Sequence, residues 1–213
     1  MEASAYAPVD ARPLRIAVCT SLPDVISDPV HDGIGIEWFT DVEHLDRFES
    51  WLAGAGGDSV LASLDAAIDV GASPVVVARQ LVLRGADWLE NRWRSGGARL
   101  KHMAIARRAA ELSPEEFSER WKGRAGSLKD ADTGHVVEIP AKARGHAYLQ
   151  NHPLATPGGG WAYDALNEVY FDELADLRVR IAWFEQNLGD HTEEDLVSES
   201  WFIAAREDVL LES

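Results

Sequence analysis

The side chains with the greatest capacity for chemistry gather in the stretch GHAYLQNHP, residues 145–153. Every second position in it is polar, and these residues are His146, Tyr148, Gln150 and His152. Because a β-strand sends successive side chains to opposite faces, the four would line one wall, and the apolar residues between them would pack against a helix layer. Two imidazoles, a phenol and an amide are costly to bury without partners. This wall is therefore either solvated or part of a site, and we take the second interpretation.

The chemistry that such a wall supports is acid–base catalysis. Imidazole titrates near pH 6.5, so His152 could give or accept a proton at neutral pH. Tyr148, His146 and Glu168 would orient the reacting group or polarise a carbonyl.

Composition excludes several classes of partner. The chain has 213 residues and a formal net charge of −16, which argues against non-specific binding to nucleic acid or to an anionic membrane. No apolar run approaches the roughly 18 to 20 residues that cross a bilayer, and the N-terminus lacks the basic and apolar regions of a secretory signal. The single Cys19 sits in an apolar strand candidate. We expect a buried thiol and a cytoplasmic protein.

Strands and helices alternate along the chain. Apolar runs predict strands at 14–22, 34–39, 74–83, 100–107, 145–153, 166–171 and 201–211. Helices are expected from Thr40 as N-cap to Gly54, near 61–68 and over 173–188. The clearest local signal is Ser113-Pro114-Glu115-Glu116-Phe117, a capping box that begins a helix reaching about Ser127. Residues 84–99 are taken as a connector with one or two helical turns.

The two parts of the sequence resemble each other. HDGIGIEWFTDVEHL at 31–45 overlays YDALNEVYFDELADL at 163–177 without a gap. AVCTSLP at 17–23 overlays AYLQNHP at 147–153, and VVVARQLVL at 75–83 overlays FIAAREDVL at 202–210. Three matches in one order indicate an internal repeat. The second copy adds a strand and a capped helix, which gives the β-α-β-β-α-β order of a ferredoxin-like fold.

The fold class expected is therefore α+β, with ferredoxin-like repeats fused in one chain into a pseudo-dimeric α/β barrel. Residues 1–95 would form a truncated half without its first strand and helix, and residues 96–213 a complete half that bears the site. Helices cover one face of such a sheet, so the bare faces of the two halves would meet. A monomer and a homodimer are both compatible with this arrangement.

The segments LSPEEFSERW, ARGHAYLQNHP and YDALNEVYFDEL, in this order, resemble the EthD-like family of the dimeric α/β-barrel superfamily. The resemblance covers residues 100–211. It implies a cofactor-free enzyme acting on oxygenated aromatic or polyketide-like molecules. Related enzymes often carry a His shortly after the capped helix, whereas this chain has none between Trp121 and Ser127, and Arg124 lies nearest to that place. This departure leaves His152 and its neighbour Asn151 as the polar groups of the implied site.

The two halves differ in polarity at matching positions. The first half has Ile16, Val18, Thr20 and Leu22 where the second has the polar wall. A pocket with one apolar and one polar wall suits a mostly apolar ligand with a few oxygen atoms. Arg124 could anchor a carboxylate, and His102 shares its parity with Ala104 and Ala106. The candidate substrate-binding residues are Asn151, Gln150, Arg124, Trp38, Tyr170, Ile36, His102 and Trp201.

A metal site is not expected. His146 and His152 lie about 20 Å apart along a strand, and no H-x-H, H-E-x-x-H or C-x-x-C spacing occurs. We expect a cofactor-independent enzyme that performs cyclisation, dehydration, isomerisation or decarboxylation on a hydrophobic oxygenated small molecule. Two alternatives stay open: a non-catalytic ligand-binding partner of an oxygenase, and a monooxygenase of the same superfamily, cofactor-free or haem-dependent.

Overall fold

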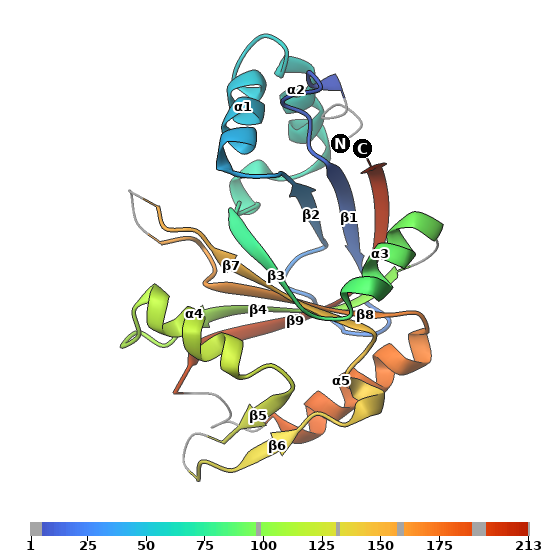
Figure 1. Ribbon diagram of the computed structural model, residues 1–213, viewed down its shortest axis with the longest axis vertical. Helices are drawn as coiled ribbons and strands as arrows, with labels where there is room; N and C mark the ends of the chain where they lie inside the picture. The colour runs from blue at the N-terminus through green and yellow to red at the C-terminus, as the bar shows by residue number, and fades with distance from the viewer. Residues whose placement is uncertain (1–5, 97–98, 131–132, 157–159, 189–194, 213) are drawn as a thin grey trace. The chain divides into compact units, whose positions relative to one another are not determined.

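A computed structural model describes residues 6–96, 99–130, 133–156, 160–188 and 195–212 (Figure 1). It is a mixed α+β fold, which confirms the expected class. The described elements include an antiparallel seven-stranded sheet in the order β2-β1-β9-β4-β8-β7-β3, a separate β5-β6 hairpin and five α-helices. Contacts group the chain into two compact units. Unit 1 comprises Met1–Thr20, Gly33–Pro74 and Glu207–Ser213, and unit 2 comprises Ser21–Asp32 and Val75–Arg206.

Unit 1 is built on the pair of strands β1 (Arg15–Ser21) and β2 (Gly33–Trp38), which are antiparallel with Cys19 opposite Ile34. Helices α1 (Val42–Leu52) and α2 (Asp58–Ala67) and a 3-10 turn (Val70–Ala72) follow. The expected N-cap of α1 is wrong by one residue. Asp41 accepts the backbone N–H of His44 at 2.8 Å, while the Thr40 hydroxyl donates to Asp41. A carboxylate is the stronger acceptor for an unpaired helical N–H group.

Unit 2 contains most of the sheet. Its strands are β3 (Ala78–Arg84), β4 (Arg99–Arg108), β7 (Ala147–Pro153), β8 (Ala165–Phe171) and β9 (Val197–Glu212), the last of which continues into unit 1. The elements β4-α4-β7-β8-α5-β9 follow the β-α-β-β-α-β order expected for the second half, and their strands lie in the order β9-β4-β8-β7. β3 comes from the first half of the sequence, yet it pairs with β7.

Helices cover both faces of the sheet in unit 2. α4 (Pro114–Gly123) and α5 (Leu174–Asn187) lie on one face (Figure 1), where Phe117 packs on Ala106, and Leu177 and Ile181 pack near Val169. α3 (Ala86–Ser95) covers the other face, which the sequence left bare. Residues 84–99 therefore hold a ten-residue helix rather than a connector with a turn or two.

A small insertion extends the α4/α5 face. It consists of the hairpin strands β5 (Ser127–Lys129) and β6 (Val136–Glu138) and a 3-10 turn (Ala141–Ala143), none of which the sequence indicated. Leu128, Ile139 and Ala143 bury their side chains together with Phe184 of α5. The insertion thus lies against α5 and forms an outer wall over the sheet.

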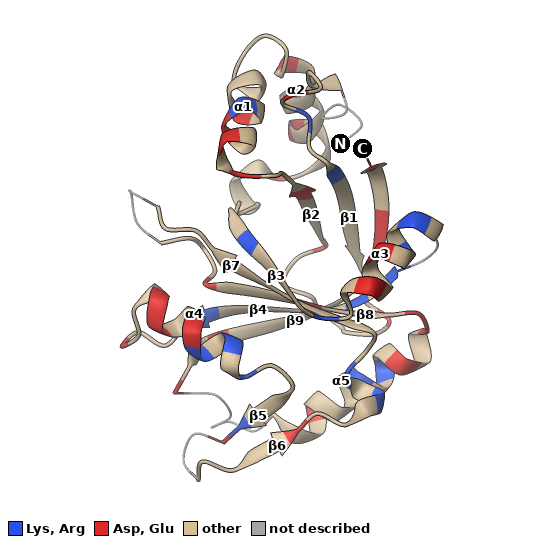
Figure 2. Ribbon diagram, viewed as in Figure 1, with Lys and Arg blue, Asp and Glu red and all other residues tan. Residues whose placement is uncertain are grey.

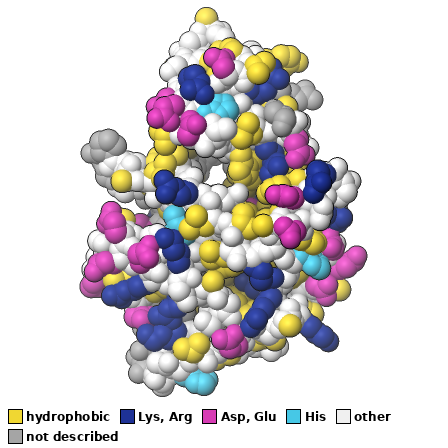
Figure 3. Space-filling model, viewed as in Figure 1, with side chains coloured by type: hydrophobic (Ala, Val, Ile, Leu, Met, Phe, Trp, Pro, Cys, Tyr) yellow, Lys and Arg dark blue, Asp and Glu magenta, His cyan; other side chains and the backbone are white. Residues whose placement is uncertain are grey.

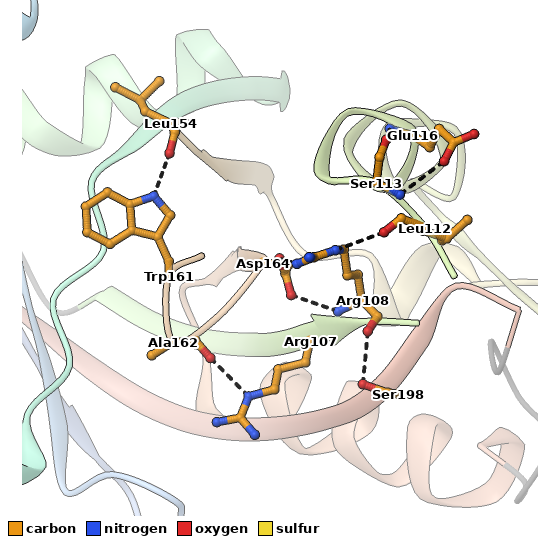
Figure 4. Close-up of polar contacts among 10 residues, drawn as sticks. All are labelled: Arg107, Arg108, Leu112, Ser113, Glu116, Leu154, Trp161, Ala162, Asp164 and Ser198. Carbon is orange, nitrogen blue, oxygen red and sulfur yellow. Dashed lines mark hydrogen bonds and ion pairs between the residues drawn. The ribbon is translucent and has the colours of Figure 1, made fainter. Parts of the chain in front are cut away.

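Polar contacts fix the connection from β4 into α4 (Figure 4). Asp164 forms an ion pair with the Arg108 guanidinium and accepts the Arg108 backbone N–H at 3.0 Å, and Arg108 also donates to the Leu112 carbonyl at 3.0 Å. At the start of α4, the Ser113 hydroxyl accepts from the Glu116 N–H at 3.2 Å, and the Glu116 carboxylate accepts from the Ser113 N–H at 3.0 Å. The predicted capping box is confirmed.

Charge is mixed over the described surface. α4 and α5 each carry both acidic and basic residues (Figure 2), and Figure 3 shows the two signs interspersed on the visible face. Among the described helices, none is both long enough and apolar enough to cross a membrane.

The capping box generates the first prediction. Replacing Ser113 by Ala should lower the free energy of unfolding by about 1 kcal/mol, because the Glu116 N–H loses its side-chain acceptor. Chemical denaturation measures the change. Ser95→Ala is the matched control: its hydroxyl donates to the Asn91 carbonyl on exposed α3, and its loss should change stability by less than about 0.5 kcal/mol. Equal effects of the two substitutions would contradict the capping role.

Candidate functional site

Unit 2 contains a cavity of about 320 Å³ between the sheet and the layer made by α4, α5 and the β5-β6 insertion. Its volume lies at the lower end of the range for small-molecule pockets. Most of the lining is apolar. The side chains that define its chemistry are His102, Tyr148, Asn167 and Arg180, and Ala104 and Val169 lie among them.

The register of the sheet builds the cavity floor. His102 on β4 is opposite Val169 on β8, and Val169 is opposite Tyr148 on β7, so the three side chains form a row on one face. The next row consists of Ala104, Asn167 and Gln150. The small side chain of Ala104 leaves the space that the cavity occupies. His102 lines this cavity together with Ala104 and Ala106, with which it shares its parity on β4.

A chain of hydrogen bonds orients Tyr148. The Gln150 Nε2 donates to the Trp121 backbone carbonyl at 3.1 Å and to the Tyr148 hydroxyl at 2.8 Å. Since a carbonyl can only accept, Nε2 is the atom that faces both groups, and the Tyr148 oxygen is an acceptor here. The phenolic proton of Tyr148 is therefore left for the cavity.

His152 lies behind this chain and not in the cavity lining. Its Nε2 is 3.1 Å from Gln150 Oε1, and its Nδ1 is 2.7 Å from the Ser118 hydroxyl. The amide oxygen can only accept, so Nε2 carries the proton and Nδ1 accepts from Ser118. Burial, with nearby Lys122, lowers the pKa of His152, in agreement with this neutral tautomer. His152 positions Gln150, and the amide separates it from Tyr148.

Some groups around Tyr148 raise the pKa of its phenol and others lower it. Burial raises the pKa of Tyr148, while the Gln150 amide, Arg180 and Arg84 act to lower it. The Asn167 side chain also bonds to the hydroxyl, and its Oδ1 accepts from Trp121 Nε1 at 2.9 Å. The neutral phenol is the stable form, and groups that would stabilise a phenolate surround it.

Arg180 and His102 form a second polar group in the cavity. Arg180 Nε donates to His102 Nδ1 at 2.9 Å, and its Nη1 donates to the Ala143 carbonyl at 2.8 Å. The His102 ring stacks on Phe202, with ring centroids 5.0 Å apart. Burial, followed by the charge of Arg180, lowers the pKa of His102 well below its usual range. Because a guanidinium only donates, neutral His102 carries its proton on Nε2.

The remaining predicted site residues lie in different parts of the structure. Arg124 lines the cavity, where it forms an ion pair with Asp195 at 3.2 Å. Glu168 is opposite Leu149 and therefore faces away from the cavity, so the expectation that it shares a wall with Tyr148 is wrong. Tyr170 and Asn151 lie on that other face as well.

Glu168 is the centre of a separate buried cluster. It forms an ion pair with Lys101 and accepts from Asn151 at 2.9 Å, from Tyr170 at 3.2 Å and from Gln80 at 3.3 Å. Burial alone would raise the pKa of Glu168, but Lys101 and these hydrogen bonds hold it below the usual value. The carboxylate is fully buried and ionised, and its partners are arranged to satisfy it.

The other predicted residues also lie outside the cavity. His146 precedes β7 and is exposed; it stacks on Trp88 at 5.1 Å and lies 3.4 Å from Asp172. Trp201 packs against Tyr163 at 5.7 Å, and the Arg107 guanidinium lies over its ring. Trp38 and Ile36 belong to β2 of unit 1. None of these four is in the cavity lining.

Sequence reasoning missed Arg180 and Asn167. Arg180 lies three residues after Leu177 and four before Phe184, on the apolar stripe of α5. A charged residue on a buried stripe is the signal that could have found it. Asn167 could not be found in this way, because its place beside Tyr148 depends on the register between β7 and β8.

Among the described residues, no three His, Cys, Asp or Glu side chains are grouped closely enough to hold a metal ion. Three groups of the cavity lining can donate hydrogen bonds to a ligand: the Tyr148 hydroxyl, the His102 Nε2–H and the Arg180 guanidinium. Such a set binds and polarises oxygen atoms.

The low pKa of His102 predicts a pH effect on stability. The unfolded chain binds a proton at His102 near pH 6.5 and the folded chain does not, so the free energy of unfolding should fall as the pH drops below about 6.5. His102→Gln keeps an acceptor for Arg180 but does not titrate. Its stability, measured by denaturation between pH 5 and 7, should depend less on pH. The control is His135→Gln, an exposed residue just before β6, and it should keep the wild-type slope; identical slopes in all three proteins would disprove the assignment.

The Lys101–Glu168 pair predicts non-additive stability changes. Lys101→Met should lower the free energy of unfolding by about 3–5 kcal/mol, because Glu168 keeps a buried, unpaired charge. Adding Glu168→Gln should restore part of this loss at pH 7. The difference between the single and double variants should shrink in denaturation experiments at lower pH, where Glu168 of the single variant takes up a proton. If the stability losses caused by Lys101→Met and by Glu168→Gln simply add in the double variant, the coupling is ruled out.

The chain was compared with family models, with curated proteins and with solved structures, and none of the three comparisons finds a match.

Proposed function

We propose that the chain is a cofactor-independent enzyme that uses acid–base chemistry on a hydrophobic, oxygenated small molecule, with Tyr148 as the acid. The observation that carries the proposal is the position of the Tyr148 hydroxyl: its oxygen accepts from Gln150, and Tyr148 lines a largely apolar cavity, to which its O–H can donate. A phenol placed in this way can protonate or polarise a substrate oxygen as negative charge develops on it. The amides of Gln150 and Asn167 and the charge of Arg180 would stabilise the phenolate that results.

The donors favour some of the expected reactions over others. Decarboxylation of a β-keto acid breaks a C–C bond and leaves its electron pair on an enolate oxygen, which the donors of this cavity can stabilise and protonate. Dehydration can use the same donor to release a hydroxyl group as water, but it also breaks a C–H bond and needs a base for that proton. Isomerisation or cyclisation by removal of a C–H proton also needs a base. The carboxylate of the described lining is Glu138, which is paired with Arg144 at 2.9 Å. Decarboxylation is therefore the reaction that the cavity supports best.

A second candidate function is ligand binding without turnover. The neutral tautomers of His102 and His152 support it, since the Nδ1 of each is already occupied by a donor and neither imidazole offers a free lone pair to the cavity. Under this alternative Tyr148 would contribute affinity alone, and the chain would carry or present an apolar molecule to an oxygenase.

A further part of the proposal is that the chain is a fused pair of ferredoxin-like repeats, as the resemblance to the EthD-like family implies, and the strand order supports the pairing of two such repeats. β7, the second strand of the complete half, neighbours β3, the last strand of the truncated half. β9, the last strand of the complete half, neighbours β1, the second-strand equivalent of the other. This reciprocal exchange is what two-fold related repeats would give, and β2 and β3 are left at the ends where the missing strand belongs. A crystal structure in which the two sheets do not face each other would rule out the pseudo-dimeric barrel.

The catalytic proposal is tested by Tyr148→Phe. Turnover of a panel of aromatic and polyketide-like β-keto and β-hydroxy acids, followed by mass spectrometry, should fall at least about 100-fold in this variant, because the proton donor is lost while the ring still fills its place. Ala104→Leu should abolish both binding and turnover by filling the cavity. Tyr163→Phe is the control, since its hydroxyl contacts His31 outside the cavity at 2.7 Å. Unchanged turnover by Tyr148→Phe would remove Tyr148 from the mechanism; binding without turnover by the wild type would favour the second function.

A further inference from the structure

The charge of Arg180 has no countercharge among the described residues. Arg180 is 7 % exposed, and both of its hydrogen-bond acceptors, His102 Nδ1 and the Ala143 carbonyl, are neutral. Burial lowers the pKa of Arg180 to about 10, so the guanidinium stays charged at neutral pH. A buried cation without an anion is costly, and chains normally pair such a group.

The other arginines of the cavity wall differ in this respect. Arg124 forms an ion pair with Asp195 at 3.2 Å, and Arg144 forms one with Glu138 at 2.9 Å. Arg84 is bonded to the backbone carbonyls of Gly145 and Arg144 and is exposed. Arg180 therefore combines deep burial, a place in the cavity lining and the absence of a described carboxylate partner.

Two N–H groups, one on Arg180 itself and one on His102, are available to a ligand. Nη2 of Arg180 and Nε2 of His102 have no hydrogen-bond partner among the described residues, and both residues line the cavity. A planar guanidinium with a free N–H edge matches a carboxylate better than it matches a single oxygen. The His102 Nε2–H lies on the side of the ring opposite to Arg180 and can donate to a different oxygen of the ligand.

We propose that the cavity selects ligands that carry a carboxylate, which Arg180 binds through its free N–H groups while His102 holds the guanidinium in place. This inference rests on the proposed function, because it assigns the ligand to the same cavity and names its class. Tyr148 and His102 lie on either side of Val169, two strands apart, so their Cα atoms are separated by about 10 Å. The carboxylate would bind at the β4 end, which leaves Tyr148 for a second oxygen of the ligand. The ligand class is thus a small apolar acid with a carbonyl or hydroxyl oxygen besides its carboxylate.

Isothermal titration calorimetry with matched probes tests the inference on the full chain. The probes are 2-naphthoate and 2-naphthamide, which share a ring system and differ in charge. The wild type should bind 2-naphthoate at least tenfold more tightly than 2-naphthamide at pH 7, and the preference should vanish in Arg180→Met. Arg178→Met, an exposed arginine of the same helix, should keep it. Equal affinity of the wild type for the two probes would overturn the inference without any variant.

Two further measurements separate this inference from the catalytic one. Arg180→Lys keeps the charge without the planar fork and should retain a smaller preference for 2-naphthoate, which covers the case in which Arg180→Met fails to fold. Tyr148→Phe should keep the full preference, because Tyr148 is not the carboxylate donor. If Tyr148→Phe keeps both the preference and full turnover, the catalytic proposal fails and the carboxylate site stands. If turnover depends on Tyr148 but naphthoate and naphthamide bind alike, the reverse holds.

Discussion

The hydrogen-bonded register between β7 and β8 is the constraint on which the site depends. It places Tyr148 opposite Val169 and Leu149 opposite Glu168, and so decides which side chains share a face. A shift by one residue would exchange every side chain between the two faces. At the entry to β7, Gly145 adopts a φ of +67°, and a Cβ there would lie 2.5 Å from the Tyr170 carbonyl oxygen. The close approach of the two strands at this point thus requires glycine.

The two faces of the sheet differ in whether their buried charges are paired with opposite charges among the described residues. On the α3 side, Lys101 and Glu168 neutralise each other, and Tyr170, Asn151 and Gln80 complete the coordination of the carboxylate. On the α4/α5 side, Arg180 contacts only neutral acceptors among the described residues, beside an open volume. The first arrangement is complete within the chain, as expected of a structural cluster. The second offers unused donors to a ligand.

The histidines show how one residue type takes several roles. His102 is buried and neutral, and it orients Arg180 in the cavity wall. His152 is also held neutral, and it acts on Tyr148 through Gln150, whose amide cannot pass a proton as an imidazole can. His146 stacks on Trp88 at the surface. The alternation that placed His146, Tyr148 and His152 on one wall assumed a regular strand from Gly145, whereas β7 begins at Ala147 and leaves His146 free to turn toward α3.

The sequence by itself determined the local elements. Period-2 and helical patterns and the Ser113 capping box located most strands and helices, because these signals arise from neighbours within a few residues. Alternation is a property of one strand, so the sequence also showed that His102 and Ala104 share one face of β4 and that Tyr148 and Gln150 share one face of β7. The tertiary structure alone decided which strands pair and in which register. The long connection between β7 and β8 does not set their register, so the position of Glu168 away from Tyr148, and of Asn167 beside it, could not be derived. The cavity itself depends on α5 bringing Arg180 to His102, 78 residues away in the sequence, and only packing between distant segments creates that contact.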